Sequence, residues 1–196
     1  MRSYKFRIYP SKAQERLMAT HLWQCKELWN ELLGLSKRMY VDFGYFPTKA
    51  TLQLLTKSQC IYSQTAQEIS RRLYAGLQRF LKLRKQGGKC GFPRFKSIDR
   101  MKSLHYPQFG FELGERLKVT PFGELSIVKH RRIAGTIKTL TLKHELTGKW
   151  FACFVVKEEK PLPKENNGKI VGIDLGLKSL ATLSDGIVIG NPRHLL

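Results

Sequence analysis

The fold is decided by two stretches, Thr136-Ile137-Lys138-Thr139-Leu140-Thr141-Leu142 and Trp150-Phe151-Ala152-Cys153-Phe154-Val155-Val156. Side chains alternate along them with a period of two, which is typical of strands that bury one face. Shorter runs of this kind occur at 117–119 and 124–128, and glycine, proline and charged residues separate the runs. Residues 3–9 alternate in the same way. The sequence therefore predicts a small antiparallel sheet or barrel that recruits residues 3–9 as a further strand.

A first helix is predicted directly after the strand at residues 3–9. Ser11 and Gln14 have the spacing of a capping box, which satisfies two backbone N–H groups at a helix start. Apolar side chains then recur at steps of three and four, as on one face of a helix. We expect an amphipathic helix over residues 12–33, with Gly34 near its end. Its apolar face consists of Met18, Leu22, Cys25, Trp29 and Leu32.

Two further helices are expected in the first half of the chain. Thr48 is a suitable N-cap for a short helix that extends to about Lys57. A longer helix is predicted from about Ser63 to Lys85, because apolar residues recur along it at helical spacing. The order of strand, helices and strands predicts an α+β fold with the helices inserted into the barrel. The apolar stripe of the long helix consists of Ala66, Ile69, Leu73, Leu77 and Phe80.

The charge of the chain indicates a polyanionic partner. The 196 residues include 35 Lys and Arg but 15 Asp and Glu, which gives a formal net charge of +20. Residues 1–100 hold 20 basic and 6 acidic side chains, whereas residues 101–196 hold 15 and 9. Such an excess repels itself unless a polyanion is present. The first half is therefore expected to carry most of the contacts, although charge alone also fits a ribosomal-type structural protein.

The densest positive charge lies between residues 71 and 102, where only Asp99 opposes it. Clustered Arg and Lys side chains position phosphates, but a charged run is also common on a solvated helix face. Phe92, Phe95 and Tyr106 add rings that either stack on bases or pack in the core. The candidate nucleic-acid contacts are Arg71, Arg72, Arg79, Arg84, Lys85, Arg94, Lys96 and Arg100, with Arg131 and Arg132 as a second patch.

The cysteines and the apolar segments exclude several classes of protein. Cys25, Cys60, Cys90 and Cys153 stand far apart with no Cys-x-x-Cys pair, so we expect buried thiols and no zinc ribbon or redox motif. The sequence has no signal-peptide pattern and no run of roughly 18 apolar residues that could span a membrane. We therefore expect a cytoplasmic protein.

A single aspartate interrupts the apolar stretch Ile170-Val171-Gly172-Ile173-Asp174-Leu175-Gly176. A carboxylate in a buried strand is costly unless it is paired or binds a metal, so Asp174 is a candidate functional residue. Residues 179–186 are expected to supply the second strand of a hairpin. Asp185-Gly186 is expected to be a turn with a structural role. Actin-like ATPases carry a looser form of this motif near their N-terminus, whereas here it follows a basic region.

Five motifs follow one another over nearly the whole chain. They are the strand that ends in Tyr9-Pro10-Ser11; Gly91-Phe92-Pro93-Arg94-Phe95-Lys96; His130-Arg131-Arg132-Ile133-Ala134-Gly135-Thr136-Ile137-Lys138; Gly148-Lys149-Trp150-Phe151-Ala152; and Val171-Gly172-Ile173-Asp174-Leu175-Gly176 with Ser184-Asp185-Gly186 and Asn191-Pro192-Arg193. This order resembles TnpB, the OrfB family of transposon-encoded RNA-guided DNA endonucleases related to type V CRISPR effectors. The resemblance implies a role in transposition and DNA recombination of a mobile genetic element.

The resemblance also implies a domain plan and a metal site. Residues 1–9 with 90–165 would form a wedge-like β-barrel, 11–85 an inserted helical recognition lobe, and 169–196 the beginning of a RuvC-like, RNase H-like domain. The partners would be a guide RNA and double-stranded target DNA. In the family, an Asp, a Glu and another Asp hold two Mg²⁺ or Mn²⁺ ions that activate water for phosphodiester cleavage. Asp174 matches the first of these carboxylates.

The resemblance ends before the family's glutamate, its last aspartate and its zinc ribbon. It therefore implies the N-terminal part of such a nuclease, and no zinc is expected. Because two ions need more than one carboxylate, we expect this chain to bind nucleic acid without cleaving DNA alone. One alternative is a non-catalytic RNA- or DNA-binding module, such as a repressor-like truncated derivative. The other is a basic structural RNA-binding protein in which the late motif is coincidental.

Overall fold

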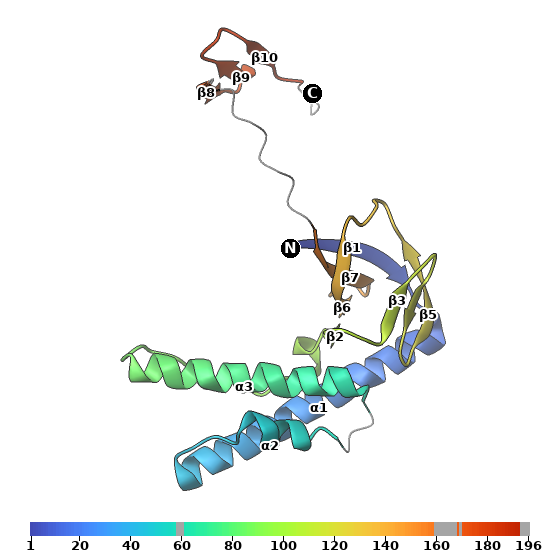
Figure 1. The fold of residues 1–196 in the computed structure, drawn as a ribbon, viewed down its shortest axis with the longest axis vertical. Coiled ribbons are helices and arrows are strands. Elements are labelled where there is room, and N and C mark those ends of the chain that lie inside the picture. Colours follow the sequence, from blue (N-terminus) through green and yellow to red (C-terminus); the bar gives the residue numbers. More distant parts are fainter. Residues whose placement is uncertain (58–60, 159–167, 169, 193–196) are drawn as a thin grey trace. The chain divides into compact units, whose positions relative to one another are not determined.

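The computed structural model describes residues 1–57, 61–158, 168 and 170–192. The chain divides into two compact units, Met1–Glu159 and Lys160–Leu196. In their described residues, the first contains three α-helices and a seven-stranded sheet, and the second contains a three-stranded sheet (Figure 1). The predicted α+β class is therefore confirmed. The proline, asparagine and glycine residues of segment 161–168 predict a linker after the first sheet, and all of this segment but Gly168 lies outside the described residues.

The sheet of the first unit is antiparallel throughout, in the order β2-β6-β7-β1-β5-β4-β3, and it curls into a nearly closed, barrel-like form. The N-terminal strand lies between β7 and β5, which confirms that residues 3–9 join the sheet. All three helices follow β1 and precede β2 in the sequence. The strands are β1 (Arg2–Tyr9), β2 (Ser103–Tyr106), β3 (Phe111–Leu113), β4 (Leu117–Val119), β5 (Gly123–Val128), β6 (Thr136–His144) and β7 (Trp150–Lys157).

Alternate residues of these strands form the core. Phe6 and Ile8 of β1 and Phe154 of β7 are 0% exposed, and the Phe6 and Phe154 ring centroids lie 6.1 Å apart. Tyr106 of β2 is buried and donates a hydrogen bond from its hydroxyl to the carbonyl oxygen of Thr120 at 2.8 Å. The alternation in the sequence therefore separates core from surface correctly in this unit.

The first helix is longer than predicted. Helix α1 spans Lys12–Phe43, with the predicted capping box at Ser11, and it continues through Gly34 to Gly44. Gly44 adopts a left-handed conformation with φ of 76°, and its N–H donates to the carbonyl oxygen of Tyr40 at 3.1 Å. The expected end near Gly34 was wrong because a glycine inside a helix only weakens it, whereas a glycine with positive φ ends it.

Helices α2 (Lys49–Leu54) and α3 (Ser63–Lys85) complete the helical part. Thr48 caps α2 as predicted, but this helix ends at Leu54 rather than near Lys57. Helix α3 has the predicted bounds, and its predicted apolar stripe is buried. The helix packs against α1, α2 and β2, and Figure 1 shows it beside the other two helices. Among the described residues, no helix is long and apolar enough to cross a membrane.

The second unit exposes most of its apolar side chains. Its strands β8 (Ile173–Leu175), β9 (Ser179–Leu183) and β10 (Val188–Gly190) pair in the order β10-β9-β8. The predicted hairpin of β8 and β9 is confirmed, but the expected burial of β8 was wrong, since Ile173 and Leu175 are 65% and 76% exposed. The described part of this unit supplies no second layer to cover the sheet, so the alternating pattern does not lead to burial.

The turn between β9 and β10 is the one predicted from Asp185-Gly186. Gly186 has a φ of 88°, and its N–H donates to the carbonyl oxygen of Leu183 at 3.0 Å. The carboxylate of Asp185 accepts a hydrogen bond from the backbone N–H of Ile187 at 3.2 Å. Asp185 therefore has the structural role that the turn signal indicated.

Candidate nucleic-acid interface

The outward side of α3 is a basic surface. Lys85 lies fourteen positions after Arg71, which corresponds to about 21 Å along a helix. The exposed residues between the basic ones are small or carry amides, such as Ala75 and Gln78. Glu68 is the one acidic residue of α3, and it is 6% exposed. We use the term basic face for Arg71, Arg72, Arg79, Lys82 and Lys85, all of which are exposed.

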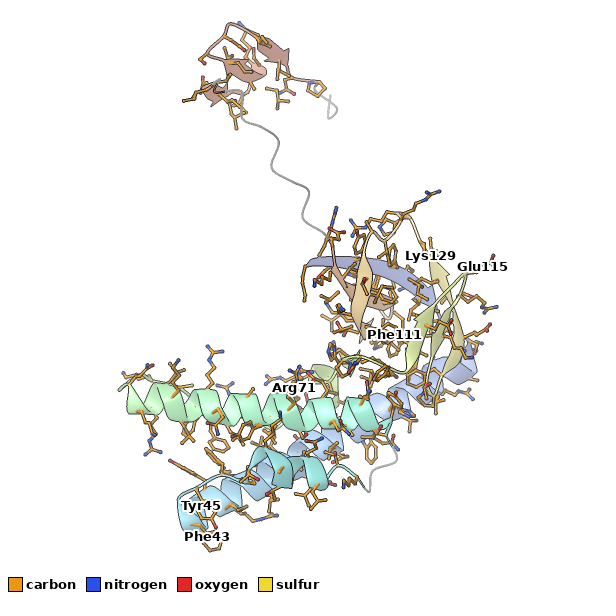
Figure 2. All side chains as sticks on the ribbon, in the orientation of Figure 1. Phe43, Tyr45, Arg71, Phe111, Glu115 and Lys129 are labelled. Atoms are coloured by element: carbon orange, nitrogen blue, oxygen red, sulfur yellow. The ribbon has the colours of Figure 1, made fainter. Side chains whose placement is uncertain are left out.

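One arginine of the basic face is fixed by the buried carboxylate. Arg71, which is labelled in Figure 2, lies on α3. It donates from Nε to Glu68 Oε2 at 2.5 Å and from a terminal nitrogen to Oε1 at 2.9 Å. These hydrogen bonds raise the pKa of Arg71 above its usual value. Arg84, also predicted as a contact, lies off this face and donates to the Tyr40 hydroxyl at 2.8 Å.

Residues 91–97, which we call the strap, are held against α1 by side-chain hydrogen bonds. The Asn30 amide pairs with the backbone of Lys96 as a neighbouring strand would, donating to its carbonyl at 2.9 Å and accepting from its N–H at 2.8 Å. Trp29 Nε1 donates to the carbonyl of Arg94 at 3.1 Å. Gly76 of α3 lies under the ring of Pro93, where an added Cβ would come within 3.5 Å. The strap therefore contacts both α1 and α3. Because these contacts hold its backbone in place, they also determine the direction in which the side chains of the strap point.

The predicted contacts of the strap divide into outward and inward side chains. Arg94 is exposed, and Phe95 is 52% exposed beside it, so a cation and a ring face solvent together. Lys96 instead lies half-buried with Nζ 3.7 Å from the centre of the Trp29 ring. Burial, with a smaller effect from Arg72, lowers the pKa of Lys96 to about 8. Arg100, on the short helix η1 (Ile98–Arg100), is exposed.

The aromatic residues of the same region have different roles. Phe92 packs against the rings of Phe46 and Phe80, at centroid distances of 5.7 and 5.2 Å. Tyr106 is buried in the sheet. Phe95 alone of the three predicted rings is exposed, so it is the one available to stack on a base.

A polar groove of about 450 Å³ lies between the helices and the sheet. Its lining includes three glutamines, Gln53, Gln64 and Gln67, together with Arg71 and Thr139. Thr139 Oγ1 is buried there without a hydrogen-bond partner among the described residues. Amide and guanidinium groups are the side chains that read base edges in duplex DNA.

The groove was missed in the sequence because its members are uncharged and come from separate elements. Gln64, Gln67 and Arg71 are spaced by three and four residues, so they share one face of α3. That spacing was the available signal. His105 also lines the groove, and its burial lowers its pKa, with its Nδ1 2.8 Å from the Thr141 hydroxyl.

The second predicted patch lies on the segment between β5 and β6. Arg131 and Arg132 are both exposed, and the Arg131 guanidinium carbon lies 4.8 Å from the centre of the Tyr4 ring. This patch belongs to the barrel-like sheet and not to the helices, so the structure holds the predicted arginines in two separate places of the first unit.

Asp174 lies on β8, opposite Thr182 of β9, with an exposed side chain. Among the described residues, no group of three or more His, Cys, Asp and Glu side chains is arranged to hold a metal ion. The described part of the second unit therefore does not fit a two-ion site, and Asp174 contributes a single carboxylate.

The cysteines are only partly as expected. Cys25 is buried, and burial raises the pKa of its thiol to about 12. Cys90 and Cys153 are half-buried, so the expectation of buried thiols was wrong for these two, while Cys60 lies outside the described residues. A thiol with so high a pKa is not a nucleophile at neutral pH, so Cys25 is part of the core.

Comparisons with known proteins agree with the motif series. Residues 1–43 match the HTH_OrfB_IS605 family, which is described as a helix-turn-helix domain; in this chain they comprise β1 and α1. The chain is 26% identical over 200 residues to "Putative RNA-guided DNA endonuclease InsQ" of Escherichia coli (strain K12), covering 96% of this chain and 48% of that protein. It is also 26% identical over 208 residues to a "Putative RNA-guided DNA endonuclease" of Streptomyces pristinaespiralis, covering 98% and 50%. The chain is therefore similar in sequence to two proteins that are named as putative RNA-guided DNA endonucleases.

The chain spans about half the length of the curated relatives that it matches. Among solved structures, it aligns with a chain of a Cas12f1-sgRNA-target DNA complex, with a TM-score of 0.49 and 12% identity. That alignment covers 97% of this chain and 57% of the other.

Proposed function

We propose that this chain is the nucleic-acid-binding part of a transposon-associated RNA-guided DNA endonuclease and that it binds a guide RNA and double-stranded target DNA. The observation that carries the proposal is the basic face, on which Arg71, Arg72, Arg79, Lys82 and Lys85 are exposed along about 21 Å of one helix. This length is roughly two-thirds of a turn of duplex DNA, so several phosphates lie within reach.

The two surfaces of the helical part have different tasks in this proposal. The basic face and Arg94 bind phosphates, which gives affinity without sequence preference. The polar groove offers Gln53, Gln64, Gln67 and the remaining donors of Arg71 to base edges, which gives sequence preference. Both surfaces are built on helices fixed by the core and by the strap, so they are organised before the ligand arrives.

The domain plan of the proposal follows the TnpB resemblance. Residues 1–9 with 90–165 are the wedge-like barrel, 11–85 the helical recognition lobe, and 169–196 the start of a RuvC-like domain in which Asp174 is the first metal-binding carboxylate. The interruption of the sheet by α1, α2 and α3 supports this plan. Mg²⁺ or Mn²⁺ would need further carboxylates beside Asp174, and so we expect binding without cleavage by this chain alone.

Identifying the RNA that purifies with the protein tests the proposal. A discrete RNA species, recovered after washing in moderate salt, is the expected result. Equal recovery of all cellular RNAs, with no preference among polyanions, would favour a basic structural RNA-binding protein. The cleavage expectation has its own test, because Mg²⁺-dependent cutting of target DNA that disappears in Asp174→Ala would overturn it.

A non-catalytic binding module is the second candidate. It is favoured by the single, exposed carboxylate at Asp174, whose loss would leave the basic face unchanged. Salt-sensitive binding that is the same in the wild type and in Asp174→Ala is expected for this candidate.

A further inference from the structure

A cavity of about 610 Å³ opens beside β5 of the barrel-like sheet. Its lining comes from Leu113 and Gly114 of the β3–β4 hairpin and from residues 129–133, which follow β5. Its volume lies within the range of roughly 300–1,000 Å³ that is typical of small-ligand sites. The basic face lies on α3 and the polar groove lies between the helices and β2 and β6, so neither surface includes this cavity.

The cavity carries positive charge and no acidic lining residue among those described. Lys129, His130, Arg131 and Arg132 are consecutive and all line it. Lys129 donates to the carbonyl oxygen of Gly114 at 2.7 Å, which ties one wall to the other. Glu115 lies in the same hairpin, on the side of Lys129, but does not line the cavity (Figure 2).

Arg132 is the group most available to a ligand. It is exposed, and among the residues that the structure describes it has no hydrogen-bond or ion-pair partner. An unpaired guanidinium at the mouth of a cavity is well suited to a phosphate, because its planar array of donors matches two phosphate oxygens.

The other side chains give the cavity a fixed, partly apolar form. The His130 ring lies against the Phe6 ring, with centroids 5.1 Å apart, and the Arg131 guanidinium lies over the ring of Tyr4. The Tyr4 hydroxyl accepts from the N–H of Ala134 at 3.4 Å and donates to Glu158. Residues 130–134 are therefore held on β1, and the cavity has its shape before a ligand binds.

We propose that this cavity binds one nucleotide unit of single-stranded nucleic acid. Arg131 and Arg132 hold its phosphate, and its base lies over Leu113 and Ile133 with the His130 ring as a flat wall. The proposal rests on the proposed function only in that the ligand is a nucleic acid. It adds a site on the sheet that recognises a nucleotide at a chain end or flipped out of a strand.

Calorimetric titration of the 196-residue chain with 5′-AMP, adenosine and inorganic phosphate tests the proposal. We expect 5′-AMP to bind at least tenfold more tightly than either part alone, since the two halves of the cavity act together. An oligonucleotide that carries a 5′-phosphate is compared with one that lacks it. A difference between them identifies a terminal nucleotide as the ligand, and equal competition identifies an internal one.

Two variants distinguish binding of 5′-AMP in the cavity from nonspecific attraction of its phosphate to a positively charged protein. Arg132→Gln should weaken 5′-AMP binding about tenfold, because it removes a guanidinium that has no hydrogen-bond or ion-pair partner among the described residues. Gly114→Phe should abolish it by filling the cavity at constant charge; a Cβ there meets only the Arg116 carbonyl oxygen, at an ordinary 3.9 Å. Lys138→Gln removes one exposed charge of the same sheet outside the cavity and should leave binding unchanged.

Equal affinities for phosphate and 5′-AMP would overturn the proposal, as would unchanged 5′-AMP binding in Arg132→Gln. If Gly114→Phe does not fold, Arg132→Gln and Lys138→Gln together still decide the question. The basic-face variant Arg72→Gln/Arg79→Gln/Lys82→Gln keeps this test apart from the proposed function. Duplex binding lost in that variant with 5′-AMP binding intact supports both. A wild type that binds 5′-AMP and single strands but no duplex supports the cavity alone, and one that binds 5′-AMP but no polynucleotide overturns both.

Discussion

The two sheets of this protein carry similar alternating sequences, yet one is buried and the other is exposed. Phe6 of β1 and Phe154 of β7 are 0% exposed, whereas Ile173 and Leu175 of β8 are mostly exposed. A period of two tells which side chains share a face of a strand, but not whether anything covers that face. The difference teaches that the core that stabilises the described chain lies in the first unit.

The largest effect that sharpens this comparison is expected from Phe154→Ala. Truncation of a fully buried phenylalanine should lower the free energy of unfolding by about 3–5 kcal/mol, because it removes apolar burial and leaves a cavity. Ile173→Ala, in the exposed sheet, should change it by no more than about 0.5 kcal/mol. Urea denaturation followed by far-ultraviolet circular dichroism measures both. Equal losses would show that β8 is covered as the core strands are.

The next largest effect is expected at the strap. Asn30→Ala removes both hydrogen bonds to the backbone of Lys96 and should cost about 1–3 kcal/mol. Asn30→Asp is the matched control, because it keeps an acceptor for the Lys96 N–H and should lose less. Thermal unfolding compares the three proteins. An alanine variant as stable as the wild type would mean that the strap is not held through Asn30.

A smaller effect concerns pH. Because the pKa of Lys96 is lowered to about 8 from the usual 10.5, the folded chain releases this proton before the unfolded chain does. The unfolded state then binds more protons between these two values, so Lys96 raises stability as pH rises through 8. Cys25 acts oppositely above about pH 9, because its pKa is raised to about 12 in the folded chain.

Lys96→Met isolates the lysine from the cysteine. The stability advantage of the methionine variant over the wild type should be greatest below pH 8 and should shrink as the pH is raised towards 10. Denaturant midpoints at pH 7, 8, 9 and 10 measure this difference. A difference that stays constant with pH would contradict the burial of the Lys96 ammonium group.

The smallest effect is expected in the second unit. Asp185→Ala removes one exposed hydrogen bond to Ile187 and should cost no more than about 0.5 kcal/mol. Amide hydrogen exchange at β9 and β10 should become faster in this variant, while exchange at β1 and β7 stays the same. Slower or unchanged exchange at β9 would contradict the structural role that we assign to Asp185.

Much of the first unit was predictable because local rules and packing agree there. The bounds of α3, the capping box at Ser11 and the recruitment of β1 into the sheet all followed from spacing. The end of α1 was not predictable, because Gly34 and Gly44 look alike in a sequence and only their backbone conformation separates them.

The sequence predicted which charged residues belong to the candidate site better than it predicted where their side chains lie. Arg71, Arg72 and Arg79 are exposed as expected, but Lys96 packs on a tryptophan that lies 67 residues away in the sequence. The amides of the polar groove were missed because they are brought together only by the fold. Asp174 lies on a strand as expected, but its side chain is exposed. Burial would have required a layer that covers the strand, and no local pattern in the sequence encodes such a layer.

The salt dependence of nucleic-acid binding tests the central claim most directly. We compare the wild type with Arg72→Gln/Arg79→Gln/Lys82→Gln of the basic face and with Lys118→Gln/Lys138→Gln/Lys149→Gln, which removes the same charge from the sheet and its turns. The slope of log affinity against log salt is negative, and each phosphate contact contributes roughly 0.9 to its steepness. The slope should therefore become less steep by between about 2 and 3 in the first variant, and should stay near the wild-type value in the second. Equal changes of slope in the two variants would contradict the account, because they would show that net charge alone, and not the basic face of α3, binds the nucleic acid.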